Sequence, residues 1–301
     1  SQLLIPTSKD LFITSSSSVI HVGSNADMKE QCNHEEADSR IMVHLMNAIQ
    51  QGTTSVKIRT GDTDVVVIVC GQYHRIDTVA IWIEFIASGK VTWINIAELC
   101  NSLGPMAKAM PMFHALTGCD VTASFRGKGK LSFANSLKKN PWFTDVLREV
   151  EQFKTVQEDS ELFQAIQHFF IKVYSSTNED GIHDINIFRK NAFCKGKRDM
   201  SQIPPTKDAL LQHTQRSIFQ ASIWMSSHQS ILPEVSPAEF GWRKNKEGKG
   251  WEPQWITKPT LANSAKALIQ CACKTGCQTA RCRCKREDIK CSNLCRCGCH
   301  E

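Results

Sequence analysis

Nine cysteines crowd the end of the chain, in the spacing C-x-C-x3-C-x4-C-x-C-x6-C-x3-C-x-C-x-C. They are Cys271, Cys273, Cys277, Cys282, Cys284, Cys291, Cys295, Cys297 and Cys299. An odd number cannot close into disulfides within the segment, and the segment has no apolar run to build a core. Thiolates are zinc ligands, and three tetrahedral zinc ions need twelve bonds. Six terminal and three bridging thiolates supply those bonds, so the spacing predicts a cluster of three zinc ions.

Basic residues lie between these cysteines. Three Zn²⁺ with nine thiolates carry three negative charges, so positive neighbours are expected. The candidates for contact with a polyanion are Lys274, Arg281, Arg283, Lys285 and Arg286. Lysine and arginine beside such a cluster predict binding to nucleic acid phosphates. A disulfide framework is the weaker alternative.

The segment CACKTGCQTARCRCKREDIKCSNLCRCGC resembles the cysteine-rich CXC domain of tesmin-type proteins. The resemblance covers about the last thirty residues. It implies a zinc-thiolate module that binds DNA through the basic residues beside the cluster. The resemblance therefore implies DNA, and with it chromatin, as the partner. It also implies the nucleus as the location.

Carboxylates stand at four places where apolar or neutral residues are usual. Asp38 lies on the apolar face of an expected helix, with Glu36 close before it. Asp62 and Asp64 follow a buried strand, and Asp120 follows an apolar helix. Several buried carboxylates together need a cation, and Mg²⁺ or Mn²⁺ prefers oxygen ligands. The structural alternative is an acidic first helical turn for Glu35, Glu36 and Asp38, and turn residues for Asp62 and Asp64.

The order of these acids resembles the flap-endonuclease branch of the 5′-nuclease superfamily, which has a PIN-like fold. The matching stretches are HEEADSRIMVHL, VKIRTGDTDVVVIV and FHALTGCDVTASFRGKGKLSFANSL, within roughly residues 30 to 140. The resemblance implies Glu36 and Asp38 as one ligand pair, Asp62 and Asp64 as a second, and Asp120 as the fifth carboxylate. Glu35 replaces Glu36 if the match shifts by one residue. The implied cofactor is magnesium or manganese, and the implied activity is phosphodiester hydrolysis.

A glycine-rich basic string follows Asp120: Arg126, Gly127, Lys128, Gly129 and Lys130. Glycines let the backbone approach a ligand closely, and the N–H groups at the start of the next helix point outward. The string therefore predicts a grip on a DNA phosphate, with a solvated loop as the alternative. The histidines, His114 included, show no metal-ligand spacing and are predicted to be core or surface residues.

The elements around these residues predict an α/β fold. A helix is expected with Asn33 as its N-cap and Gly52 at its end, followed by a strand at 56–60, a buried run at 65–70 and a strand at 79–86. Helices are expected at 96–103, 107–116, 131–139, 161–174 and 207–227. Residues 233–259 are rich in proline, glycine and tryptophan and predict a packed wrap or linker. For Trp242, Trp251 and Trp255, core packing is favoured over stacking on bases.

We therefore predict an α/β protein with a PIN-like domain over residues 1–140, a mainly helical extension with a Trp/Pro-rich linker over 141–262, and a CXC zinc domain over 263–301. The net charge of +6 fits a polyanionic partner. The longest uninterrupted apolar run, Val65–Cys70, is too short to span a membrane, so no membrane partner is expected. Two functions are open: a metal-dependent nuclease tethered to DNA by its zinc module, or a catalytically inactive nuclease-like scaffold that binds DNA or chromatin.

Overall fold

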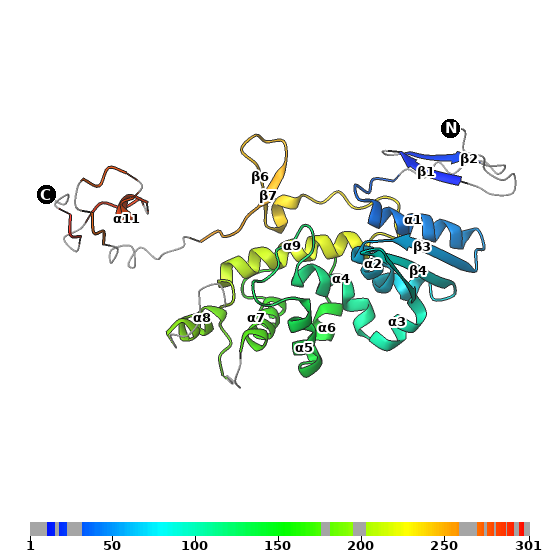
Figure 1. Cartoon of the computed structure of the whole chain (residues 1–301), viewed down its shortest axis with the longest axis horizontal. Coiled ribbons are helices and arrows are strands. Elements are labelled where there is room, and N and C mark those ends of the chain that lie inside the picture. Colours follow the sequence, from blue (N-terminus) through cyan, green and yellow to red (C-terminus); the bar gives the residue numbers. More distant parts are fainter. Residues whose placement is uncertain are drawn as a thin grey trace. The chain divides into compact units, whose positions relative to one another are not determined.

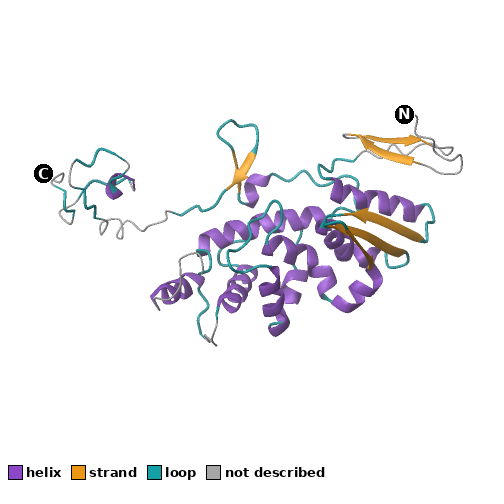
Figure 2. Ribbon diagram, in the orientation of Figure 1, coloured by secondary structure: helices purple, strands orange, loops and turns teal. Residues whose placement is uncertain are grey.

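The structure is a computed structural model. It describes residues 11–15, 18–22, 32–175, 181–194 and 203–258, and within the tail 270–273, 276–279, 281–286, 288–291 and 295–297. The chain divides into two compact units, residues 1–255 and residues 256–301. Figure 1 shows the course of the chain and Figure 2 its mixture of helices and strands. The predicted α/β class is confirmed at that level, while the PIN-like fold stays a prediction.

The central sheet has three strands, β3 (Ser55–Thr60), β4 (Ala80–Ala87) and β5 (Lys90–Asn95). β3 and β4 are parallel, and β4 and β5 form an antiparallel hairpin. Along β4, Ile81 and Ile83 are buried while Trp82 between them is exposed, which is the alternation of a strand with one covered face. A separate antiparallel hairpin is formed by β1 (Leu11–Ser15) and β2 (Ser18–Val22).

Helix α2 (Thr63–Gln72) connects the parallel strands β3 and β4. It contains the apolar run at 65–70, so that run is a buried helix. α2 packs closely on α4 (Met106–Thr117) because Gly71 faces Pro111: a Cβ atom on Gly71 would lie 2.8 Å from Pro111 Cδ. At its other end, the N-terminus of α2 lies beside the C-terminal half of α4, where Asp64 contacts His114.

Two further helices pack beside these elements: α3 (Ile96–Leu103) on β4 and β5, and α1 (Ala37–Gln50) on α2. α1 begins later than expected, at Ala37 with Glu36 as its N-cap. The predicted cap, Asn33, has another use: its side chain donates to Leu232 O at 3.0 Å and accepts from Leu232 N at 2.7 Å. This pair of hydrogen bonds ties the segment before α1 to the segment after α9.

The rest of the first unit is helical. Its helices are α5 (Lys130–Lys139), α6 (Trp142–Arg148), α7 (Glu161–Tyr174), α8 (Ile185–Cys194) and α9 (Lys207–Met225). Ser160 and Thr206 cap α7 and α9 by accepting from backbone N–H groups, as hydroxyl caps do. One hydrophobic core runs from Met42 to Phe240, so residues on both sides of position 140 share it.

The proline- and tryptophan-rich segment forms a short 3-10 helix, η3 (Pro237–Phe240), and a hairpin of β6 (Trp242–Lys244) and β7 (Trp251–Pro253). The expectation of core packing is wrong for two of its tryptophans, since Trp251 is 37% exposed and Trp255 57% exposed. Trp251 begins β7, and Trp255 follows the hairpin with the Arg216 guanidinium over its ring. In the part of the chain that the structure describes, no helix has both the length and the apolarity to cross a bilayer.

Candidate functional site

Three separate segments bring the predicted carboxylates together. Glu36 is the N-cap of α1 and Asp38 lies in its first turn. Asp62 is the N-cap of α2 and Asp64 lies in its first turn. Asp120 follows the C-terminal end of α4. Glu36 and Asp120 are exposed and the other three acids are half-buried, so the expectation of buried carboxylates is wrong for Glu36 and Asp120. The charges of all five side chains nevertheless interact.

The pKa values of Glu36 and Asp38 record this interaction. Desolvation, followed by the charges of Asp38, Asp64 and Asp120, raises the pKa of Glu36 above its ordinary value. Desolvation, followed by the charges of Asp62, Asp64 and Asp120, raises the pKa of Asp38. An acid at a helix N-terminus is ordinarily stabilised in its charged form. Here desolvation and the neighbouring carboxylates together outweigh that effect.

The N-terminus of α2 is built by local hydrogen bonds. Asp62 Oδ1 accepts from the backbone N–H of Asp64 at 2.8 Å, and Thr60 Oγ1 accepts from the N–H of Asp62 at 3.0 Å. Asp62 therefore caps the helix while its other oxygen remains for a ligand. The structural role of Asp62 is thus compatible with the predicted ligand role, because capping uses only one of its two carboxylate oxygens.

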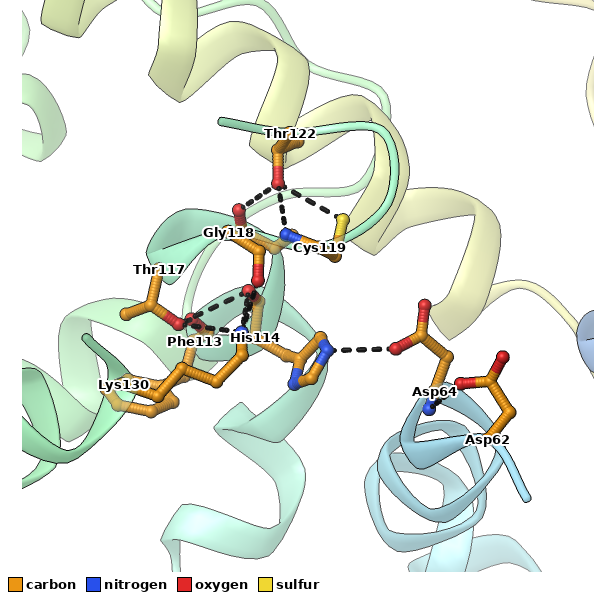
Figure 3. Close-up of polar contacts among 10 residues, drawn as sticks. Asp62, Asp64, Phe113, His114, Thr117, Gly118, Cys119, Thr122 and Lys130 are labelled. Carbon is orange, nitrogen blue, oxygen red and sulfur yellow. Dashed lines mark hydrogen bonds and ion pairs between the residues drawn. The ribbon is translucent and has the colours of Figure 1, made fainter. Parts of the chain in front are cut away.

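His114 belongs to this site, which the sequence analysis did not foresee. Its Nε2 lies 2.9 Å from Asp64 Oδ1, and both side chains are largely buried, at 8% and 15% exposure (Figure 3). The signal in the sequence is weak: a single polar residue inside the apolar run Met112–Leu116, on a helix that packs against α2. Its contact with Asp64 depends on that packing, which spacing along the chain does not reveal.

The turn that carries Asp120 is held from several sides. Gly118 has φ +108°, and Thr122 Oγ1 donates to Ala115 O at 2.6 Å. The Lys130 ammonium donates to His114 O at 3.0 Å, to Thr117 Oγ1 at 3.2 Å and to Gly118 O (Figure 3). Lysine thus satisfies the open carbonyls at the end of α4. The ammonium predicted to contact DNA is engaged within the protein, and it orders the turn before Asp120.

α9 also supports the end of α4. His213 Nε2 lies 2.8 Å from Leu116 O, in a fully buried environment. Burial lowers the pKa of His213 to about 4, so the ring is neutral at physiological pH and donates to the Leu116 carbonyl. The acidic site therefore depends on α9 although none of its five carboxylates comes from that helix.

The remainder of the glycine-rich string forms a turn at the surface. Lys128 N donates to Phe125 O at 3.0 Å, and Gly127 has φ +73°, the conformation that a type II turn requires of its third residue. Arg126, Gly127 and Gly129 are exposed, and Gly129 is the N-cap of α5. Lys128 lies over the ring of Tyr174, 5.4 Å from its centroid. Arg126 is thus the member of the string that extends from the turn into solvent.

In the tail, sulfur atoms gather into three overlapping groups, each able to hold a metal ion. The groups are Cys271, Cys273, Cys277 and Cys282; Cys271, Cys284, Cys291 and Cys295; and Cys271, Cys277, Cys291 and Cys297. Within each group the sulfurs lie within 4.8 Å of one another. Cys271 Sγ lies 3.6 Å from Cys277 Sγ and 3.4 Å from Cys297 Sγ. These distances approach the edge of a zinc-thiolate tetrahedron, about 3.8 Å for Zn–S bonds of about 2.3 Å. They are far longer than a disulfide.

The surroundings of these sulfurs are basic. Arg281, Arg283, Lys285 and Arg286 are exposed, the last three on the short helix α11 (Arg283–Arg286). Two predicted site residues, Lys274 and Cys299, lie outside the described residues. The tail is therefore a cysteine cluster able to bind metal, with positive charge on its surface.

The two clusters differ in compactness. Among the described residues, only cysteines form groups of three or more candidate ligands within 4.8 Å. The carboxylates of the first unit are spaced more widely. No known protein family, curated protein or solved structure matches the chain. The resemblances to flap endonucleases and to tesmin-type domains therefore remain predictions.

Proposed function

We propose that the chain is a DNA-binding protein that hydrolyses phosphodiester bonds at the acidic cluster and holds DNA through its zinc-binding tail. One observation carries the proposal: Glu36, Asp38, Asp62, Asp64 and Asp120 come from three separate segments, and desolvation together with their mutual charges raises the pKa of Glu36 and Asp38. A fold gains nothing by gathering like charges, so a cationic ligand is the natural explanation.

The donor set of the cluster fits magnesium or manganese. All five candidate ligands are carboxylates, which hard divalent ions prefer. When bound, two such ions stabilise charge on the attacking and leaving oxygens of a phosphodiester. In this proposal Asp62 and Asp64 hold the cation site from α2, Glu36 and Asp38 hold it from α1, and Asp120 closes it. His114 orients Asp64, and Arg126 with the backbone at Gly127 and Gly129 receives a neighbouring phosphate.

For the tail we propose three zinc ions. Cys271 belongs to all three sulfur groups, and Cys277 and Cys291 belong to two each, which supports these three as the bridging thiolates. The terminal ligands are then Cys273, Cys282, Cys284, Cys295 and Cys297. Cys299, which lies outside the described residues, is the sixth terminal ligand that the sequence predicts. Arg281, Arg283, Lys285 and Arg286 contact DNA phosphates without reading sequence. This role is compatible with a nuclear location and with chromatin as a partner.

The test uses flapped and branched DNA with Mn²⁺ and compares the wild type with Asp62→Asn/Asp64→Asn. Asparagine keeps the capping ability of position 62 and removes both charges. We expect cleavage and Mn²⁺ binding by the wild type and loss of both in the double variant. Asp145→Asn, an exposed acid on α6, is the control and should change neither. Cleavage that survives the double variant would exclude hydrolysis at this site.

A second function, DNA binding without hydrolysis, is favoured by the wide spacing of the acids. In the described part of the chain, no three carboxylates come within 4.8 Å of one another. A wild type that binds DNA through its tail but neither binds Mn²⁺ nor cuts DNA would have this function.

A further inference from the structure

A cavity of about 440 Å³ adjoins the acidic cluster. It lies between α9, the segment that follows α9, and the base of the β6–β7 hairpin. Its aromatic walls come from Phe153, Phe219, Trp242 and Trp251. The volume is within the ~300–1,000 Å³ of small-molecule sites. A cavity of this size with aromatic walls suits a flat ring system.

The cavity and the acidic cluster share a wall. Glu36 lines the cavity and also interacts with Asp38, Asp64 and Asp120. Gln220, on α9, also lines the cavity. Val121, the residue after Asp120, is a third lining residue. A molecule in the cavity would therefore be held directly beside the carboxylates.

The hairpin at the cavity is fixed to α9 by a buried arginine. Arg216 donates to Gly241 O at 3.0 Å and to Gln254 O at 2.7 Å, on either side of the hairpin. Its guanidinium also lies 5.9 Å from the Trp242 ring centroid and 5.3 Å from that of Trp255. Burial lowers the pKa of Arg216 to about 10, which leaves it charged at neutral pH. The aromatic walls are thus held in place before any ligand arrives.

The hairpin also presents positive charge. Lys244 Nζ lies 4.0 Å from the ring centroid of Trp251, and Lys246 and Lys249 are exposed in the turn. Arg243 is paired with Glu252 at 2.8 Å, so these lysines are the cations directed at solvent. An aromatic ring next to lysines is the pattern with which proteins hold single-stranded nucleic acid, a base on the ring and phosphates on the cations.

We propose that this cavity binds an unpaired nucleobase of the DNA strand whose phosphate lies at the acidic cluster. The base stacks against Trp251 and Phe219, and the adjoining phosphates contact Lys244 and the hairpin lysines. The inference rests on the proposed function, which supplies the phosphate position, and it adds the substrate class: a strand with at least one unpaired base. Fully paired DNA could not fill the cavity without opening a base pair, which costs free energy.

The test compares two single strands of equal length and charge, an oligothymidylate and an abasic oligonucleotide. Binding to the full chain is measured by fluorescence anisotropy with Ca²⁺ in place of Mn²⁺. The ratio of the two dissociation constants isolates the contribution of the bases, because the tail contacts the phosphates of both strands. We expect the wild type to favour the oligothymidylate by about fivefold to about 150-fold, the range for one stacked base.

Two variants should bring that ratio towards one: Trp251→Ala, which removes the exposed ring, and Ile223→Trp, which fills the cavity. Trp93→Ala, at a tryptophan of β5 that is 52% exposed, should keep the wild-type ratio. A wild-type ratio of one, or a ratio that Trp251→Ala leaves unchanged, would overturn the inference while cleavage could persist. If Trp251→Ala lowers the ratio but Asp62→Asn/Asp64→Asn still cuts DNA, the pocket stands and the hydrolytic proposal fails.

Discussion

The imidazole of His114 and the carboxylate of Asp64 lie 2.9 Å apart and are both shielded from solvent, although they belong to different helices. The packing of Gly71 on Pro111 makes this contact possible, since it brings α2 against α4. The hydrogen bond fixes one oxygen of Asp64 and so sets the direction of the other. A residue distant in sequence thus determines the geometry of a candidate metal ligand.

Replacing His114 with alanine should weaken Mn²⁺ binding by about 10- to 100-fold, the usual cost of removing a group that orients a metal ligand. Isothermal titration with Mn²⁺ measures the affinity, and circular dichroism checks that the variant is folded. The matched control is His74→Ala, at an exposed histidine outside the acidic cluster. Equal Mn²⁺ affinity in a folded His114→Ala protein would show that Asp64 needs no such support.

Without divalent cations, Glu36 and Asp38 should make the protein less stable as the pH rises. In the folded state the pKa values of Glu36 and Asp38 lie above their ordinary values of 4.5 and 3.8. Between the ordinary and the raised values, the folded state therefore binds more protons than the unfolded state. Stability falls with rising pH wherever the folded state holds the extra protons. This loss of stability is absent below pH 3.8 and is complete above the raised pKa values. Urea unfolding across this range measures it.

The control is the double variant Glu36→Gln/Asp38→Asn, which should lack this decline. Because both proteins contain His213, the difference between their free energies of unfolding also cancels its contribution. Its lowered pKa acts in the opposite direction: its stabilising effect is present above pH 6.5 and is lost as the pH falls towards 4. Mn²⁺ should stabilise the wild type more than the variant. A difference between them that does not change with pH would mean that the two carboxyls are unperturbed.

The acidic residues could be found from sequence because each stands at a helix end with its own local signal. Asp62 precedes α2 and Asp120 follows α4, and both positions show in the pattern of apolar residues. Other features could not be found in this way. The partner of Lys130 is the end of α4, and the partner of Asn33 is the segment after α9, so both depend on tertiary packing.

The sequence also could not show the secondary structure of the run at 65–70 or the exposure of the tryptophans near residue 250. The run at 65–70 is apolar all round, and a buried helix then has the same composition as a buried strand. The tryptophans near residue 250 are large apolar groups for which core packing is the usual expectation. Only the position of the hairpin, fixed by Arg216, shows why Trp251 and Trp255 stay at the surface.

Gly118→Ala should destabilise the protein by about 2–3 kcal/mol, since the substitution combines a strained backbone with a clash. Gly118 has φ +108°, and a Cβ there would lie 2.8 Å from Ser124 Cα. Gly127→Ala is the matched control, because Gly127 has φ +73° with nothing within 4 Å. It should cost only about 1 kcal/mol of backbone strain. Equal losses in urea unfolding would show that the Asp120 turn tolerates a side chain.

The overlap of the sulfur groups predicts that cysteines of the tail differ in importance. Purified chain should contain about three zinc ions, and chelation should remove the tail's share of the salt-sensitive DNA binding. Cys273 belongs to one sulfur group and Cys271 to all three. Cys273→Ser should therefore lower the zinc content by about one ion, whereas Cys271→Ser should lower it by two or more, because bridging thiolates complete two tetrahedra.

Elemental analysis of the purified variants measures these losses, with Cys119→Ser as the control. Cys119 lies outside the three sulfur groups, so its replacement should leave the zinc content unchanged. DNA binding should follow zinc content, because the exposed arginines of α11 keep their positions only while the neighbouring cysteines hold metal. Equal zinc loss from Cys271→Ser and Cys273→Ser would argue for separate ions without bridging sulfur. Less than one zinc ion per wild-type chain would remove the basis for a zinc module.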